Sequence, residues 1–195
     1  MPRLSGLKIG LAVTGSFCTF GACLETARLL AAEGAELTAV LSDAAARTDT
    51  RFGQAEDFIR SLLEITGRAP ITTITGAEPI GPAKMFDALV VSPCTGNTLA
   101  KIANAVTDTP VTMAVKAQLR NGGPVVIGVS SNDALGLNAK NLGILLAARD
   151  VYFVPFRQDD PEGKPRSLAA ARRFTADAVA AAIRREQLQP IIAAE

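Results

Sequence analysis

Short apolar segments alternate with helical segments along this chain, and this alternation constrains its fold more than any other feature. Five segments have the length and the nearly continuous apolar character of strands buried on both faces of a sheet. They are residues 8–13, 36–41, 88–91, 124–129 and 151–154. Because helix-like segments separate them, successive strands are expected to form βαβ units. The pattern therefore predicts an α/β fold with a doubly wound parallel sheet.

Helical periodicity and helix-terminating residues place the helices between these strands. We expect helices from residue 21 to about residue 33, at 54–66, from Leu99 onward, from Pro110 to about residue 121, and around 142–146. Ser167 is expected to cap a last, alanine-rich helix that runs to about residue 186. Residues 44–52, 67–84 and 159–166 are expected to be loops, with one short strand at 71–74. No stretch has the composition of a linker, so we expect a single domain over residues 1–195.

Composition excludes several classes of function. The net charge of +1 argues against nucleic acid or an anionic membrane as the main partner. The sequence contains no histidine, which excludes Ser-His-Asp and Cys-His mechanisms within this chain and disfavours a zinc site. No apolar run is long enough to span a bilayer and no signal peptide is evident, so we expect a cytoplasmic protein with reduced cysteines.

Three segments that directly follow predicted strands share an unusual composition. Residues 14–16, 92–98 and 130–133 are rich in hydroxyls, carboxamides and glycine, and none contains lysine or arginine. In an open parallel sheet these segments meet beyond the carboxyl ends of the strands, where ligands bind. Unpaired backbone N–H groups at a helix N-terminus attract anions, and glycine lets a phosphate approach closely. The three segments together predict a phosphate site built from amides and hydroxyls.

Each of these features also has a purely structural interpretation. Serine, threonine and asparagine at helix starts are ordinary caps, and only the coincidence of three such loops favours a ligand. The absence of a G-x-G-x-x-G pattern disfavours a dinucleotide site, and Asp43 is better explained as a solvated acid or helix cap. Cys18 and Cys94 are expected to be small buried residues rather than reactive thiols, and Cys23 is expected in the core.

The segment Ser-Pro-Cys-Thr-Gly-Asn-Thr at 92–98, with the helix after it and residues 140–146 and 151–155, resembles the flavoprotein family. This family comprises flavin prenyltransferases and homo-oligomeric flavin-containing cysteine decarboxylases. The resemblance implies a three-layer α/β/α flavodoxin-like (Rossmann-like) sandwich with a parallel sheet, assembled as a homo-oligomer with FMN where two subunits meet. It also implies a set of cofactor-binding residues: Gly15, Ser16, Ser42, Ser92, Pro93, Thr95, Gly96, Asn97, Thr98, Ser130 and Ser131, with no metal ligands.

A narrower resemblance covers nearly the whole chain. Residues 14–19, 50–53, 76–82, 131–138 and 151–156 resemble one branch of this family that takes part in spore formation. The resemblance implies oxidation of a dihydro- or hydroxytetrahydropyridine dicarboxylate to the aromatic pyridine, with a second subunit that carries a nicotinamide-binding domain. The lack of histidine argues against peptidyl-cysteine decarboxylation, and the lack of a cation at 130–133 argues against prenyl transfer.

Asn132 and Asp133 are the candidate catalytic residues, at the face where substrate would meet the flavin; the alternative is a turn with a helix cap. A dicarboxylate needs cationic partners, which we expect from Arg51, Lys140, a neighbouring subunit or the partner chain. Two other functions stay open. One is another FMN-dependent decarboxylase or reductase, and the other is a non-catalytic FMN-binding or scaffold subunit.

Overall fold

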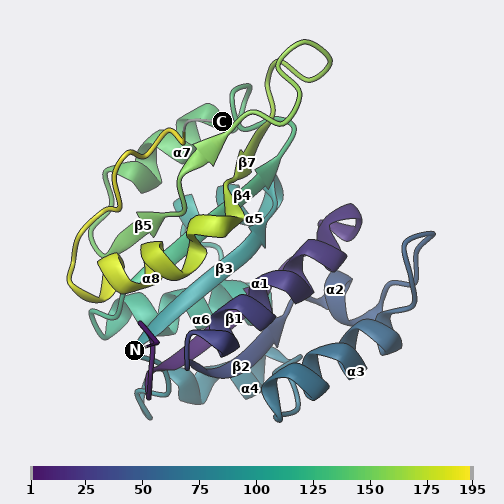
Figure 1. The fold of residues 1–195 in the computed structure, drawn as a ribbon, viewed down its shortest axis with the longest axis vertical. Coiled ribbons are helices and arrows are strands. Elements are labelled where there is room, and N and C mark those ends of the chain that lie inside the picture. The colour runs from purple at the N-terminus through teal and green to yellow at the C-terminus, as the bar shows by residue number, and fades with distance from the viewer. Residues whose placement is uncertain (1, 194–195) are drawn as a thin grey trace.

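The computed structural model describes residues 2–193 and centres on a twisted sheet (Figure 1). Five parallel strands follow the order β2-β1-β3-β4-β5. Their bounds are β1 Lys8–Val13, β2 Glu36–Leu41, β3 Ala88–Cys94, β4 Val125–Ser131 and β5 Val151–Phe153. This is the flavodoxin-type order, in which the chain reverses its winding direction between β1 and β3. The predicted parallel sheet and its strands are confirmed.

Helices cover both faces of the sheet and bury two separate apolar clusters. One face packs against α1 (Phe20–Ala32), α2 (Asp43–Arg47), α3 (Ala55–Thr66) and α8 (Thr175–Ile183). The other face packs against α4 (Ile74–Ala77), α5 (Gly96–Ala103), α6 (Pro110–Arg120) and α7 (Ala139–Leu146). Three short 3₁₀ turns, η1 (Phe17–Thr19), η2 (Glu78–Ile80) and η3 (Arg172–Phe174), connect these elements. The result is the three-layer α/β/α sandwich that the sequence predicts.

The chain after β5 departs from the prediction. Instead of a helix from residue 168, it forms an antiparallel hairpin of β6 (Phe156–Arg157) and β7 (Leu168–Ala170), whose loop projects at the top of Figure 1. β7 pairs with the end of β4, where Ser130 faces Ala169. The backbone groups at this end of β4 need hydrogen-bond partners, and this requirement overrides the helical propensity of the alanines. The prediction that Ser167 caps a helix is therefore wrong.

Smaller differences concern the connections. Residues 43–47 form helix α2, which Ser42 caps, instead of a loop. The predicted strand at 71–74 is reduced to one bridge between Ile71 and Val40, and helix α4 begins at Ile74. Helix α5 begins at Gly96, and Thr95 provides its cap.

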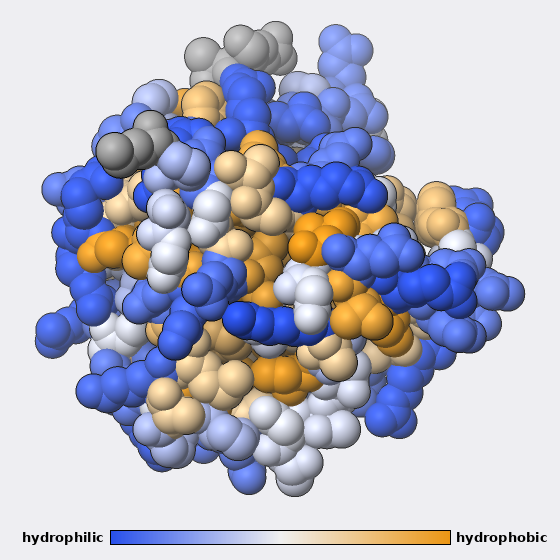
Figure 2. Space-filling view, turned by 60° about the horizontal axis from the view of Figure 1, so that its bottom comes forward, coloured by the Kyte–Doolittle hydropathy of each residue, from blue (hydrophilic) through white to orange (hydrophobic). Residues whose placement is uncertain are grey.

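The surface is mixed in character. On the face shown in Figure 2, hydrophobic residues are exposed in separate areas near the middle, among hydrophilic residues. Between residues 2 and 193, no helix combines the length and the apolar character needed to cross a membrane. Within the same residues, no group of three or more side chains of the types that bind metals is arranged to hold an ion.

Candidate functional site

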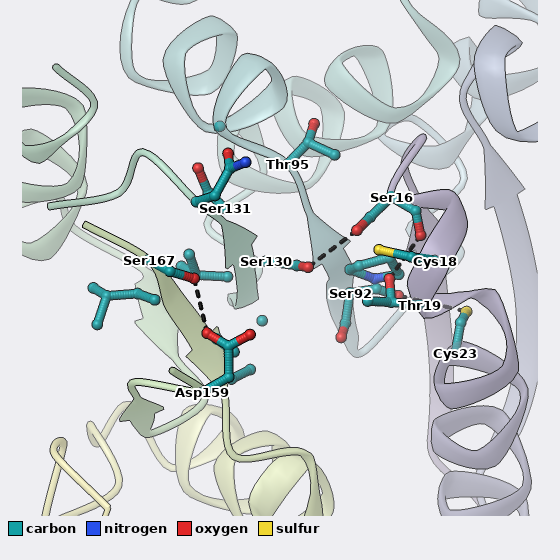
Figure 3. A pocket seen from close by; sticks show the side chains of 18 of the residues that line it. Ser16, Cys18, Thr19, Cys23, Ser92, Thr95, Ser130, Ser131, Asp159 and Ser167 are labelled. Atoms are coloured by element: carbon teal, nitrogen blue, oxygen red, sulfur yellow. Dashed lines mark hydrogen bonds between the residues drawn. The ribbon is translucent and has the colours of Figure 1, made fainter. Parts of the chain in front are cut away.

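A cavity of about 550 Å³ opens beyond the carboxyl ends of the parallel strands (Figure 3). The loops after β1, β3 and β4 form one side of it, and the β6–β7 hairpin with the turn before α8 forms the other. Arg51 and Phe52, from the segment between α2 and α3, complete the rim. The cavity lies where the winding direction of the sheet reverses, which is the usual ligand position in this architecture. Its volume is in the range of small-molecule sites.

Thr14 holds the β1 and β3 loops together. Its side chain is buried, and its Oγ1 donates a hydrogen bond to the carbonyl oxygen of Pro93 over 2.7 Å. The same oxygen accepts a hydrogen bond from the backbone N–H of Thr95 over 3.0 Å. Both hydrogen-bonding functions of one buried hydroxyl are thus used to fix the strand ends.

A second contact joins the β1 and β4 loops. Ser16 Oγ lies 3.1 Å from Ser130 Oγ, and a dashed line marks this hydrogen bond in Figure 3. Together with the Thr14 contacts, this pair brings all three hydroxyl-rich loops to one place. The predicted convergence of these loops is confirmed.

The N-terminus of α5 offers free hydrogen-bond donors at the cavity. Thr95 caps the helix, since its Oγ1 accepts the N–H of Thr98 over 3.3 Å. The backbone N–H groups of Gly96 and Asn97 make no hydrogen bond within residues 2–193. Unpaired N–H groups and the partial positive charge of a helix N-terminus together favour an anion.

Close packing explains why glycine occupies the first position of this helix. A Cβ atom at Gly96 would lie 2.7 Å from Ser131 Oγ and 2.8 Å from Asn138 Nδ2. Any larger residue would displace Ser131, which lines the cavity, or Asn138. Glycine thus lets both side chains pack closely against the start of α5.

Most of the predicted site residues surround the cavity. Nine line it: Gly15, Ser16, Ser92, Pro93, Thr95, Gly96, Ser130, Ser131 and Asn132. Four do not: Ser42, Asn97, Thr98 and Asp133. Which of these residues contact a cofactor or a substrate stays a prediction.

Two of the four have structural tasks. Ser42 Oγ accepts the N–H of Ala45 at the start of α2. The carboxylate of Asp133 accepts the N–H of Leu137 over 3.2 Å and a hydrogen bond from Nδ2 of Asn138 over 3.1 Å. Asp133 thus makes the turn contacts that its alternative interpretation requires.

The three cysteines occupy different environments. Cys23 and Cys94 are buried as expected, and burial raises the pKa of each thiol to about 12. The expectation for Cys18 is wrong, because this residue is exposed and lines the cavity. It lies in η1, a turn that precedes the packed part of α1 and therefore escapes the core.

Sequence reasoning missed most of the charged residues of the site. Arg157, Lys164 and Arg172 line the cavity, as does the expected Arg51, whereas Lys140 does not. Asp159 is the one acidic residue among the described residues of the lining. The three missed cations come from the hairpin and the turn before α8, which the sequence did not predict.

Asp159 is held in place by its neighbours in the hairpin. Ser167 Oγ donates a hydrogen bond to Asp159 Oδ1 over 2.9 Å, as Figure 3 shows, and Lys164 Nζ lies 3.7 Å from Oδ2. The bond from Ser167, supported by the charges of Lys164 and Arg157, lowers the pKa of this carboxyl below its ordinary value. Asp159 is therefore an anion at neutral pH.

Comparison with known proteins connects this geometry to a family. Residues 2–169 match the family model described as Flavoprotein. The chain is 43% identical over 192 residues to the B subunit of dipicolinate synthase from Bacillus subtilis (strain 168). The match covers 98% of this chain and 96% of that protein.

Solved structures show the same likeness. The crystal structure of the dipicolinate synthase B subunit from Bacillus halodurans C superimposes with a TM-score of 0.90 at 41% identity, over 98% of each chain. The FMN-dependent cysteine decarboxylase SpaF gives a TM-score of 0.68 at 21% identity, over 93% of this chain and 97% of that one. The second likeness concerns the fold alone.

Proposed function

The chain belongs to the flavoprotein family. From this premise we propose that it binds FMN in the cavity beyond the carboxyl ends of the parallel strands, and that it is one component of a dipicolinate synthase. In this role it takes part, with the A subunit of dipicolinate synthase, in oxidising a dihydro- or hydroxytetrahydro-dipicolinate to dipicolinate during sporulation. The relatives from two Bacillus species support this assignment by their similarity over almost the entire chain. We further propose that the chain forms a homo-oligomer, as the family resemblance implies, and that it is located in the cytoplasm.

The observation that carries the proposal is the uncharged cradle formed by three loops. The free N–H group of Gly96, that of Asn97 next to it and the hydroxyl of Ser16 are donors that suit the phosphate of FMN. The absence of a side chain at Gly96 lets Ser131, which lines the cavity, pack against the start of α5. The residues present therefore fit the group.

The ring of the cofactor is assigned to the β4 side of the cavity. Ser130 and Ser131 line this side, and β7 holds them through backbone pairing. Asn132 also lines the cavity and is our candidate for contacting the reacting face. We now assign Asp133 a positioning role, because its carboxylate is engaged in fixing the turn that carries Asn132.

Oxidation of the dihydropyridine ring to an aromatic pyridine requires little covalent chemistry from the side chains of this chain. Loss of a hydride and a proton converts a dihydropyridine dicarboxylate into the aromatic pyridine, and bound FMN supplies the hydride acceptor. The chain's own residues orient the substrate against that acceptor and exclude water from it. We assign no role to Cys23 and Cys94, because both side chains are buried and burial raises their pKa values.

The test begins with the absorption spectrum of the purified chain after addition of FMN and removal of unbound flavin. We expect a stoichiometric yellow complex. Dipicolinate formation is then measured with this complex by itself, with the A subunit by itself and with both together. The proposal predicts that the FMN complex raises the rate obtained with the A subunit.

Two results would overturn parts of the proposal. A folded chain that stays colourless has no FMN site. A complex that binds FMN, while the rate with the A subunit is the same with and without flavin, is a non-catalytic FMN-binding subunit.

A further inference from the structure

The charges around the cavity are divided between its two sides. The loops after β1, β3 and β4 contribute no charged side chain to the described lining. The opposite wall contributes Arg157, Lys164 and Arg172, and Arg51 lies at the rim. Asp159 is the only acid among the described lining residues, so this side carries a surplus of positive charge.

Among the described residues, Asp159 is the one acid of the lining on which these charges act, through Lys164 and Arg157. The guanidinium groups of Arg157 and Arg172 make no hydrogen bond or ion pair with any residue between 2 and 193. Arg51 lies over the ring of Phe52, 4.8 Å from the ring centre. Lys164 lies near Asp159, whose other oxygen is already bound by Ser167. Two arginines beside a cavity therefore remain available to an external anion.

The backbone fixes these arginines relative to the proposed flavin site. Arg157 pairs with Ala169 in the hairpin, and Ala169 pairs with Ser130 in β4. Arg172 follows β7 by two residues, in the turn η3. The cationic wall is thus joined by sheet pairing to the loop assigned to the flavin ring.

We propose that Arg157, Arg172 and Lys164 form the substrate subsite, in which the two arginines bind the carboxylates of a planar aromatic or dihydroaromatic dicarboxylate. This inference rests on the proposed function and names the groups that select its substrate. The planar fork of an arginine donates two parallel hydrogen bonds to a carboxylate, so two arginines suit a ligand with two such groups. Lys164 adds charge, and Asp159 restrains its position.

The experiment measures binding of dipicolinate to the FMN-loaded chain by isothermal titration calorimetry in metal-free buffer. Picolinate, with one carboxylate, and nicotinamide, with none, are the comparison ligands. The variants are Arg157→Gln, Arg172→Gln and the control Arg166→Gln, which removes an exposed cation of the same hairpin outside the cavity. Titrations of each apoprotein with FMN and with riboflavin accompany them.

We expect dipicolinate to bind more tightly than picolinate, and nicotinamide to bind weakest. Each cavity variant should weaken dipicolinate binding by about tenfold or more, because each loses charge-assisted hydrogen bonds. The control should bind dipicolinate like the unmodified chain. FMN affinity should be the same in all variants.

Three results would overturn the inference and leave FMN binding intact. They are failure of the FMN-loaded chain to bind dipicolinate, unchanged dipicolinate affinity in both cavity variants, and an equal loss in the control. Weaker binding of FMN but not riboflavin in the cavity variants would also overturn it, by assigning the arginines to the phosphate instead. Failure of the unmodified chain to bind FMN would refute the proposed function itself.

Discussion

At the scale of single residues, the site depends on polar side chains that look like ordinary turn residues in the sequence. Thr14 lies at the end of a predicted strand and would pass for a turn residue. In the structure its buried hydroxyl both donates to Pro93 and accepts from Thr95. Its importance follows from contacts with residues about 80 positions away, which local patterns cannot reveal.

Replacing Thr14 by valine keeps the shape of the side chain and removes the hydroxyl. The N–H of Thr95 then loses its acceptor, which should cost about 1–3 kcal/mol of unfolding free energy. Urea denaturation measures this loss, and FMN titration should show weaker binding. Thr48→Val, at an exposed position, is the matched control and should change neither quantity. Equal stability of the two variants would show that the Thr14 contacts are dispensable.

The thiols give a second test at this scale. Because burial raises the pKa values of Cys23 and Cys94 to about 12, both stay protonated below that pH, while exposed Cys18 is accessible to reagents. Between about pH 7 and pH 9, iodoacetamide should therefore modify one cysteine of the native chain and all three of the unfolded chain, as mass spectrometry can measure. FMN should slow modification of Cys18, which lines the cavity. Rapid native modification of Cys94 would contradict its burial.

At the scale of elements, strands and helices could be predicted where one apolar period dominates, as in β1, β2 and α3. The β6–β7 hairpin could not, because its short strands are stabilised by the edge of β4 rather than by their own sequence. Because the hairpin was not predicted, its cations Arg157 and Lys164 were not recognised as cavity residues. The three hydroxyl-rich loops after β1, β3 and β4 were recognised because their position follows from the parallel sheet, and the apolar segments predicted that sheet well.

The N-terminus of α5 can be tested by a pair of glycine substitutions. At Gly96 a methyl group would come within 2.8 Å of Ser131 and Asn138, so Gly96→Ala should lower FMN affinity by about tenfold or more. Gly143 lies in the middle of α7, where an added Cβ atom would have no heavy atom within 4 Å. Gly143→Ala should leave FMN affinity unchanged and raise the unfolding free energy by about 0.5–1 kcal/mol. Calorimetry and urea denaturation separate the two effects, and equal FMN affinity in both variants would refute the role of Gly96.

At the scale of the whole molecule, the two sides of the cavity differ in chemistry. One side offers neutral backbone and hydroxyl donors, and the other offers arginine and lysine side chains. Such a division allows a phosphate and a carboxylate ligand to bind side by side without competing for the same groups. The side with uncharged donors was predicted from the sequence, whereas the cations Arg157, Lys164 and Arg172 required the three-dimensional path of residues 156–172.

The most direct test of the proposed phosphate site is to titrate the folded apoprotein with FMN and with riboflavin under identical conditions. The two ligands differ only in the phosphate, so the ratio of their dissociation constants measures how much the three hydroxyl-rich loops contribute to phosphate binding. We predict that FMN binds at least about 100-fold more tightly, as two or more hydrogen bonds to a charged group would give. Equal affinities, or no binding of FMN, would show that these loops do not form a phosphate site.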